Sequence, residues 1–272
     1  MKRILTVQDI SCVGQCSITV ALPVLSSMGL ETAILPTSVL SNHTTGFNGY
    51  SYLDLSNEFD KILEFWQKND IKFDGIYTGY LGSEKQIDQV IRLIDDRLNE
   101  GGLVIVDPVM GDDGSLYGGF NQTYPESNKK LLSRADVIVP NITEACLLTG
   151  EKFSNSQSKE YIEGLIQKLR EICPKNVVLT GVSFEEDKMG VCYYDGAIRY
   201  EFSERIPKSY HGTGDVFASS LAGCLFNGES IEKAVKVAIK FVLDSIKLTS
   251  SEHWYGVSFE KAIPFLLENL KK

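Results

Sequence analysis

The strongest constraint on the fold of this chain is a regular alternation of short apolar segments with longer amphipathic ones. The apolar segments predict strands at 3–8, 31–39, 73–78, 103–107, 137–139 and 177–180. Between them, the spacing of apolar residues predicts helices near 15–28, 56–69, 84–99 and 158–172. Strands that are connected through helices pair in parallel, and the helices cover both faces of the sheet. The sequence therefore predicts an α/β fold, a three-layer sandwich around a mostly parallel central sheet.

The alternation ends after residue 188. Residues 189–194 and 197–203 flank Asp195-Gly196, a pair typical of tight turns, and predict an antiparallel hairpin at the sheet edge. Helices are then expected near 215–227, 230–248 and 258–270. Because no linker, repeat or low-complexity block interrupts the chain, we expect one domain over residues 1–272.

The composition and net charge of the chain limit the classes of partner that it is expected to bind. The net charge of −9 disfavours nucleic acid and anionic membranes, which both need a basic surface. Neither a secretory leader nor an apolar run of about eighteen residues is found, so no membrane association is expected. The six cysteines are scattered, as expected for reduced thiols in the cytoplasm. Cys12 and Cys16 are not followed by a second pair at zinc-binding spacing, which argues against a zinc site.

Polar residues and glycines follow each predicted parallel strand. In an open α/β sheet, ligands bind beyond the carboxyl ends of the strands, so these residues are the candidates for chemistry. They are Gln8-Asp9, Thr78-Gly79-Tyr80, Asp107-Pro108, Pro140-Asn141 and Thr180-Gly181.

The segment His211-Gly-Thr-Gly-Asp215 stands at the start of a predicted helix. Two glycines allow backbone N–H groups to converge there on a phosphate or a developing oxyanion. The Asp215 carboxylate beside them could accept a proton from an alcohol during phosphoryl transfer. A helix cap would use the same residue types, and this segment alone leaves both interpretations open.

Three common nucleotide and hydrolase motifs are absent. The chain contains no Gly-x-x-x-x-Gly-Lys-Ser/Thr loop and no Gly-x-Ser-x-Gly elbow. After the first strand it reads Asp9-Ile-Ser-Cys-Val-Gly14 in place of a dinucleotide-binding glycine pattern. These absences disfavour P-loop enzymes, α/β-hydrolases and dinucleotide-dependent enzymes.

Five motifs in order give the chain a family resemblance. They read Ser41-Asn-His-Thr44, Thr78-Gly-Tyr-Leu-Gly-Ser83, Asp107-Pro-Val-Met-Gly-Asp112, Pro140-Asn-Ile-Thr-Glu144 and His211-Gly-Thr-Gly-Asp215. The last resembles the C-terminal signature of the ribokinase-like superfamily, and the others resemble its vitamin kinases, the pyridoxal and hydroxymethylpyrimidine kinases. The resemblance extends from about residue 3 to residue 250.

The resemblance implies roles for the residues of these motifs. Asp215 would be the base for a 5'-hydroxymethyl group, and Gly212, Thr213 and Gly214 would form the anion hole. Asp107 and Glu144 would lie near Mg-ATP and hold the metal directly or through water. Asn141 would support the phosphates, and Thr180 and Gly181 would help to bind the nucleotide.

The pyridine ring site would include His43, Thr44, Thr45 and Tyr80. At the end of the first strand, pyridoxal kinases usually carry Gln-Ser, whereas this chain has Gln8-Asp9 with a serine at Ser11. We therefore assign Asp9 and Ser11 to the substrate site and expect Asp9 to affect substrate preference. Hydroxymethylpyrimidine kinases often have cysteine at the position of Asp215, so aspartate favours a pyridoxal kinase.

The glycine-rich stretch that follows Asp107 is interpreted as a flap over the substrate, covering 111–119 and extending to 125. A simple surface loop is the alternative.

The leading hypothesis is an ATP-dependent kinase for pyridoxal, pyridoxine and pyridoxamine. A hydroxymethylpyrimidine kinase or a dual-substrate kinase, a non-catalytic pyridoxal phosphate binding protein and a sugar kinase are the alternatives. An intact Asp215 argues against a mere binder, and the Asn42-His43-Thr44 and Asp107-Pro-Val-Met110 stretches fit a sugar kinase poorly. The resemblance further implies a homodimer, and it leaves open a monovalent cation beside Mg²⁺.

Overall fold

A nine-stranded sheet organises the molecule, and its order is β11-β10-β9-β8-β5-β4-β1-β2-β3. The computed structural model describes residues 1–44, 46–207 and 210–270. The strands are β1 (Arg3–Ser11), β2 (Glu31–Leu40), β3 (Tyr52–Asp54), β4 (Phe73–Thr78), β5 (Leu98–Val106), β6 (Gly111–Asp112), β7 (Ser115–Leu116), β8 (Val137–Ile138), β9 (Asn176–Val182), β10 (Lys188–Tyr194) and β11 (Ile198–Glu204). The helices are α1 (Ile18–Ser27), α2 (Ser56–Lys68), α3 (Glu84–Arg97), α4 (Tyr124–Leu132), α5 (Ile142–Thr149), α6 (Lys159–Ile172), α7 (Thr213–Phe226), α8 (Ile231–Lys247) and α9 (Phe259–Leu270).

The six central strands, from β9 to β2, are parallel, as the alternation predicted. β10 and β11 form the predicted antiparallel hairpin at one edge. β3, which was not predicted, pairs antiparallel with β2 at the opposite edge. The prediction of a mostly parallel α/β sheet is confirmed.

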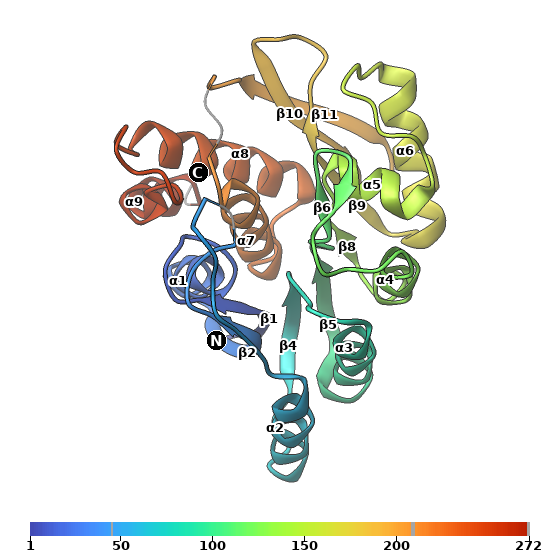
Figure 1. Cartoon of the computed structure of the whole chain (residues 1–272), viewed down its shortest axis with the longest axis vertical. Helices are drawn as coiled ribbons and strands as arrows, with labels where there is room; N and C mark the ends of the chain where they lie inside the picture. The colour runs from blue at the N-terminus through green and yellow to red at the C-terminus, as the bar shows by residue number, and fades with distance from the viewer. Residues whose placement is uncertain (45, 208–209, 271–272) are drawn as a thin grey trace.

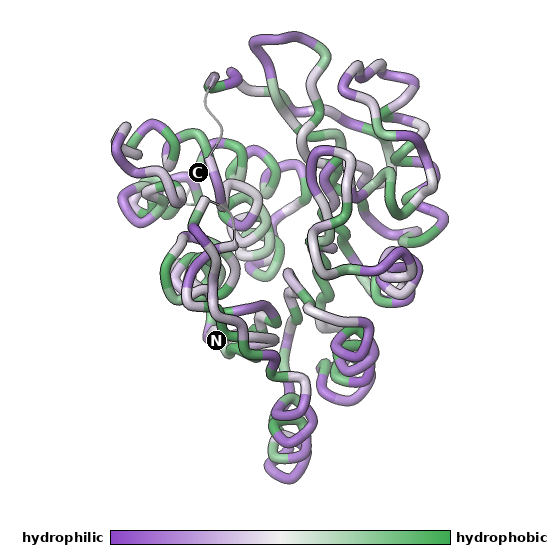
Figure 2. The backbone as a smooth tube through the Cα atoms, viewed as in Figure 1, coloured by the Kyte–Doolittle hydropathy of each residue, from purple (hydrophilic) through white to green (hydrophobic). Residues whose placement is uncertain are grey.

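Helices cover both faces of the sheet, and each face has its own apolar cluster (Figure 1). On one face, α2, α3, α4, α5 and α6 contribute buried residues such as Phe59 and Leu165. On the other face, α1, α7, α8 and α9 contribute buried residues such as Val24 and Leu221. Figure 2 shows the same division: apolar segments lie along the strands and inner helix faces, and hydrophilic residues line the outer side of α2 and α3. The three-layer sandwich is therefore built around two cores.

Serine caps begin three of the helices where the sequence predicted them. Ser83, Ser158 and Ser230 accept hydrogen bonds from the backbone N–H groups of Gln86, Tyr161 and Lys233, respectively. The first helix begins later than predicted, at Ile18, because Ser17 has a left-handed φ of 50°. The short β6–β7 hairpin, α4 and α5 were not predicted.

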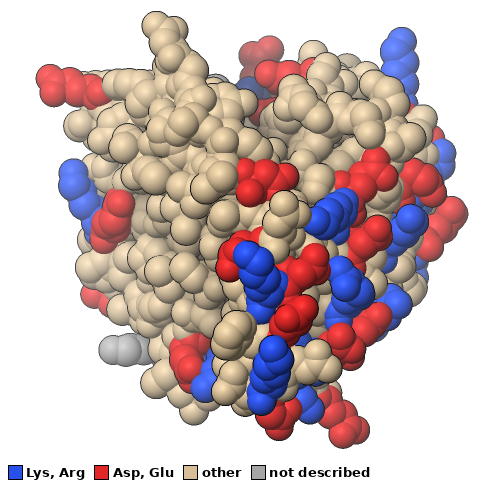
Figure 3. Space-filling model, turned by 60° about the horizontal axis from the view of Figure 1, so that its bottom comes forward, with Lys and Arg blue, Asp and Glu red and all other residues tan. Residues whose placement is uncertain are grey.

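The surface is acidic overall, but both signs of charge occur side by side. On the face in Figure 3, Lys and Arg side chains alternate with Asp and Glu over much of the charged area. Within the described part of the chain, no helix is both long and apolar enough to cross a membrane.

Candidate active site

The predicted base and anion hole lie at the N-terminus of α7. Gly212 precedes the helix with a φ of 76°, and Thr213, Gly214 and Asp215 form its first turn. A Cβ atom at Gly212 would lie 1.9 Å from the carbonyl oxygen of Gln15, so only glycine fits this turn. The first N–H groups of a helix have no partner within the helix and attract anions. The structure thus brings the Asp215 carboxylate and a set of N–H donors together.

Asp215 has an unusual protonation equilibrium. Burial, with a smaller contribution from the nearby charge of Asp9, raises its pKa to about 7. The carboxyl is half-buried and also interacts with the backbone of Ser17, which lowers the pKa. A carboxyl with a pKa near neutrality can take up and release a proton under physiological conditions.

Asp9 lies at the end of β1 and is buried, as is Ser11. The Ser11 hydroxyl donates a hydrogen bond of 3.1 Å to Asp9 Oδ2. Burial raises the pKa of Asp9, while Ser17, Ser11 and the charge of His43 lower it. The structure therefore places Asp9 near both Asp215 and His43, a residue of the predicted ring site.

Glu144 closes a capping box at the start of α5. Its Oε2 accepts from the Asn141 backbone N–H at 2.9 Å, and Asn141 Oδ1 accepts from the Glu144 N–H at 2.9 Å. Its Oε1 accepts from the Met110 N–H at 2.9 Å, which ties α5 to the turn after β5. Burial raises the pKa of Glu144 to about 7, although these backbone N–H groups lower it.

Asp107 follows β5 and belongs to the same electrostatic group. Burial, then the charges of Glu144 and Asp215, raise its pKa well above the usual range. Buried carboxylates that repel one another favour either protonation or a bound cation. Among the described residues, no group of three or more His, Cys, Asp or Glu side chains is placed to hold a metal ion. Mg²⁺ commonly uses one or two carboxylates together with water and substrate phosphates, and Asp107 and Glu144 fit that pattern.

The predicted nucleotide residues lie on neighbouring strands. Asn141 forms a parallel bridge with Thr180, and its side chain donates to the Gly111 carbonyl oxygen at 3.0 Å. The Thr180 N–H donates to the Pro140 carbonyl oxygen at 2.9 Å. Gly181 has a φ of 79°, a conformation that glycine adopts readily. Asn141, Thr180 and Gly181 therefore lie together at the carboxyl ends of the strands, where Glu144 also lies.

Only some of the residues predicted for the ring site lie near other residues of the site. The rings of His43 and His211 lie 5.6 Å apart, which joins the 41–49 loop to the anion-hole segment. Tyr80 lies 5.6 Å from Phe120 by ring centroids. Thr44 is exposed. Thr45 lies outside the described residues.

An aromatic group beside this loop was not predicted. The ring of Phe47 lies 4.7 Å from that of Trp254, and a Cβ atom at Gly46 would lie 3.1 Å from Trp254. Ser17 was not among the predicted site residues either, yet its side chain interacts with Asp9. No spacing rule connects residues 47 and 254, so only the tertiary fold reveals their contact.

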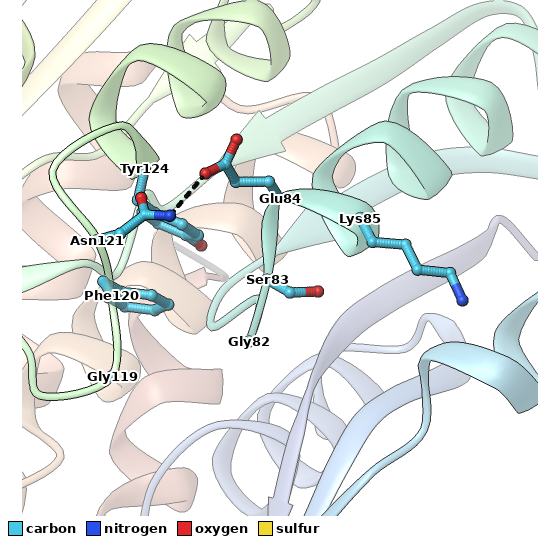
Figure 4. A pocket seen from close by; sticks show the side chains of 8 residues that line it. All are labelled: Gly82, Ser83, Glu84, Lys85, Gly119, Phe120, Asn121 and Tyr124. Atoms are coloured by element: carbon cyan, nitrogen blue, oxygen red, sulfur yellow. Dashed lines mark hydrogen bonds between the residues drawn. The ribbon is translucent and has the colours of Figure 1, made fainter.

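The predicted flap contains the β6–β7 hairpin. The Gly114 N–H donates to Thr143 Oγ1 at 3.0 Å, and Tyr117 N–H donates to the Met110 carbonyl oxygen at 2.9 Å. A cavity of about 320 Å³ lies at the C-terminal end of this segment, and Asp215 is not among the residues that line it. Its lining residues are Gly82, Ser83, Glu84, Lys85, Gly119, Phe120, Asn121 and Tyr124 (Figure 4). The cavity therefore adjoins Phe120, whose ring lies beside that of Tyr80, and its lining includes none of Asp107, Glu144 and Asp215.

The fold and the gathered carboxylates define a class of α/β small-molecule kinases, and comparisons with known proteins agree. A putative phosphomethylpyrimidine kinase from Bacteroides thetaiotaomicron, solved with pyridoxal, is 38% identical, with a TM-score of 0.91 over 97% of this chain and 95% of that one. Pyridoxal kinase from Lactobacillus plantarum is 32% identical, with a TM-score of 0.91 over 98% and 97% of the two chains. Pyridoxal kinase from Staphylococcus aureus, solved with AMP-PCP, is 25% identical, with a TM-score of 0.82 over 95% and 93%.

Residues 16–257 match the family described as phosphomethylpyrimidine kinase. The chain belongs to this family. The five sequence motifs had already indicated a resemblance to vitamin kinases.

Proposed function

We propose that this protein transfers the γ-phosphoryl group of ATP to the 5'-hydroxymethyl group of pyridoxal, pyridoxine or pyridoxamine. The observation that carries the proposal is Asp215, a carboxyl with a pKa of about 7 in the first turn of α7. Similarity to structures that contain pyridoxal or AMP-PCP supports both substrates. In this reaction the chain acts as one catalytic domain.

Asp215 takes the proton of the hydroxymethyl group as its oxygen attacks the γ-phosphorus. The N–H groups around Gly212, Thr213 and Gly214 stabilise negative charge on the transferring group. The bond to the β-phosphate oxygen breaks, and ADP leaves with that electron pair. Because the base and the donors belong to one helical turn, a single rigid element sets their relative positions.

Asp107 and Glu144 would hold Mg²⁺, directly or through water, together with the ATP phosphates. Their mutual repulsion, which raises the pKa of Asp107, is the structural feature that a cation would relieve. Bound there, Mg²⁺ supplies charge neutralisation for the phosphates. Asn141, Thr180 and Gly181 complete the nucleotide site in this proposal, and a monovalent cation is a further candidate.

The acceptor ring would lie among Asp9, Ser11, His43, Thr44, Thr45 and Tyr80. Asp9 is an acceptor for a ring N–H or hydroxyl group, and Ser11 holds its orientation. Tyr80 contributes a flat apolar face. The segment 111–125 would cover the bound substrates and limit the entry of water.

A second candidate is phosphorylation of hydroxymethylpyrimidine, alone or together with the pyridines. The family description and the name of the Bacteroides relative favour it. Aspartate at position 215 favours the pyridines, by the resemblance described above. A non-catalytic pyridoxal phosphate binder would have no use for a base at this position.

The cellular location and the oligomeric state of the protein are also part of this proposal. We place the enzyme in the cytoplasm, which its six free cysteines support. We also propose a homodimer, by the family resemblance; the exposed side chains of Tyr50, Tyr52 and Leu53 beside edge strand β3 offer apolar surface for it.

A substrate panel tests the proposal. Pyridoxal, pyridoxine, pyridoxamine and hydroxymethylpyrimidine are each incubated with the protein and Mg-ATP, and kcat/KM is measured from ADP release. We expect the highest kcat/KM for one of the three pyridines. A higher value for hydroxymethylpyrimidine would support the second candidate, and no turnover of any compound would contradict both.

A further inference from the structure

Three buried polar atoms beneath the site have no hydrogen-bond partner among the described residues. They are Gln8 Oε1, the Tyr77 hydroxyl oxygen and Ser219 Oγ, and each of these side chains is 0% exposed. Buried polar atoms in proteins are nearly always hydrogen-bonded, because an unpaired one costs free energy. Three such atoms in one region therefore need a common explanation.

The register of the sheet brings Gln8 and Tyr77 to the same face. Tyr77 on β4 lies between Thr6 on β1 and Ile105 on β5. Tyr77 and Ile105 belong to the cluster beneath α7, so Gln8 and Asp107, two residues beyond Thr6 and Ile105, point to that face as well.

Gln8 reaches across the sheet above Tyr77. A Cβ atom at Gly79 would lie 2.8 Å from Gln8 Cδ, so the Gln8 side chain covers this glycine. Its amide nitrogen donates to Thr6 Oγ1 at 2.8 Å, which leaves its oxygen as the unpaired atom.

α7 completes the group from the other side. Asp215 and Ser219 are four residues apart and therefore lie on one face of the helix. Burial and the charges of Asp107 and Asp215 raise the pKa of Tyr77, while Ser219 and Gln8 lower it. The Tyr77 hydroxyl therefore lies near both side chains, although neither makes a hydrogen bond of normal geometry with it. Thr78 also has an unpaired hydroxyl, but it points to the opposite face of the sheet.

We propose that Gln8, Tyr77 and Ser219 hold one water molecule beneath Asp215, and that this water positions the Asp215 carboxylate for phosphoryl transfer. A buried water makes two to four hydrogen bonds, and the three unpaired atoms together with one carboxylate oxygen supply four partners. Gln8 Oε1 accepts one hydrogen of the water, the Tyr77 and Ser219 hydroxyls donate to the water oxygen, and the second hydrogen is left for Asp215. Tyr77 is then a positioning residue, because it acts through the water and does not touch the substrate.

The test is Tyr77→Phe, which removes the hydroxyl and keeps the ring. We expect kcat to fall ~10-fold, because a hydrogen bond that orients charged groups is lost, while both KM values stay within about twofold. Ser219→Ala should change kcat in the same direction. Tyr193→Phe is the matched control, since Tyr193 is buried in the same apolar cluster but on β10, and it should leave kcat unchanged. A Tyr77→Phe enzyme with wild-type kcat would overturn the proposal.

The kinetic test rests on the proposed function, so a spectroscopic test accompanies it. The carboxyl ¹³C resonance of Asp215, assigned by its loss in Asp215→Asn, should move in Tyr77→Phe and stay in place in Tyr193→Phe. A wild-type protein without kinase activity would contradict the proposed function, and this resonance would still decide the role of Tyr77. If Tyr77→Phe does not fold, Ser219→Ala decides it by the same resonance, and an unmoved signal overturns the proposal.

Discussion

The Asp215 carboxyl lies between the N-terminus of α7 and the buried Asp9 side chain, and these two neighbours have opposite effects on it. The helix N-terminus favours the ionised form, whereas Asp9 and burial favour the protonated form. The outcome is a pKa of about 7, so a large fraction of this carboxyl is ionised at neutral pH.

Asp215→Asn should lower kcat by ~10²–10⁴, which is the usual contribution of a general base. The KM values for ATP and pyridoxal should change little, because the lost interaction forms mainly in the transition state. Steady-state kinetics measures both, and Asp88→Asn, an exposed change on α3, is the control. A folded Asp215→Asn protein with near-normal kcat would place the base elsewhere.

Asp9→Asn should move the acidic limb of the kcat/KM profile to lower pH. Loss of a negative neighbour favours the ionised form of Asp215, so its pKa falls and the base stays active in more acidic solution. Rates measured between about pH 5 and pH 9 locate this limb. An unchanged limb, or a shift to higher pH, would show that Asp9 does not control the base.

At the scale of elements, Glu84 joins α3 to the end of the flap. Its Oε1 accepts from Asn121 Nδ2 at 3.1 Å (Figure 4) and from Thr123 Oγ1 at 2.7 Å, and its Oε2 accepts from Ser127 Oγ at 2.6 Å. Next to these residues, Phe120 stacks on Tyr124 with ring centroids 3.9 Å apart. Glu84 therefore fixes the aromatic pair that supports Tyr80.

Glu84→Ala should loosen the flap and raise the KM for pyridoxal more than the KM for ATP. Hydrogen exchange of residues 111–123 should become faster, because two hydrogen bonds to this segment and a third to Ser127 of α4 are lost. Glu126→Ala is the matched control. Glu126 is exposed on α4, and among the described residues its side chain forms an ion pair with Lys129 alone. Equal KM changes for the two substrates would contradict a specific link to the ring site.

The sequence predicted the long periodic elements well, because their apolar spacing depends on local geometry alone. It missed α5, whose eight residues are too few for a clear period. Asn141 and Glu144, the cap of α5, were assigned to the nucleotide site, and they are also the start signal of a helix. The two-residue strands β6 and β7 carry no periodic signal at all.

The candidate site was predictable to the extent that parallel topology brings strand ends together. Asp107, Asn141 and Thr180 were selected in this way, the glycines before Asp215 drew attention to that residue, and the family motifs added Glu144. Tyr77 could not be recognised as a site residue, because a tyrosine within an apolar strand indicates a residue of the hydrophobic core. Its polar surroundings come from β1 and α7, which are far away in the sequence.

At the scale of the whole molecule, the buried acids make stability depend on pH. Burial raises the pKa of Asp215 from 3.8 to about 7 and also raises that of Asp9. The folded state therefore binds more protons than the unfolded state between these values, and the free energy of unfolding falls as the pH rises through this window.

Asp215→Asn should thus raise the Tm at pH 8, where the wild-type carboxylate is ionised and partly desolvated, by about 2–4 °C per kcal/mol recovered. Below about pH 3 the two proteins should melt alike, because the acid is then protonated in both states. Circular dichroism melts at the two pH values measure the difference. A lower Tm for Asp215→Asn at pH 8 would mean that the helix N-terminus outweighs burial.

The division into two cores also affects how the sequence of such a protein can change during evolution. The base and Asp9 are held by α7 and β1, whereas Glu144 belongs to α5, whose apolar residues pack in the cluster on the opposite face. Substitutions around Asp9 can therefore change the contacts of β1 and α7 without repacking the layer to which Glu144 belongs. Under the proposed function, such substitutions alter the choice of acceptor and leave the contact of Glu144 with Mg-ATP unchanged, so relatives named for a pyridine and for a pyrimidine can share one architecture.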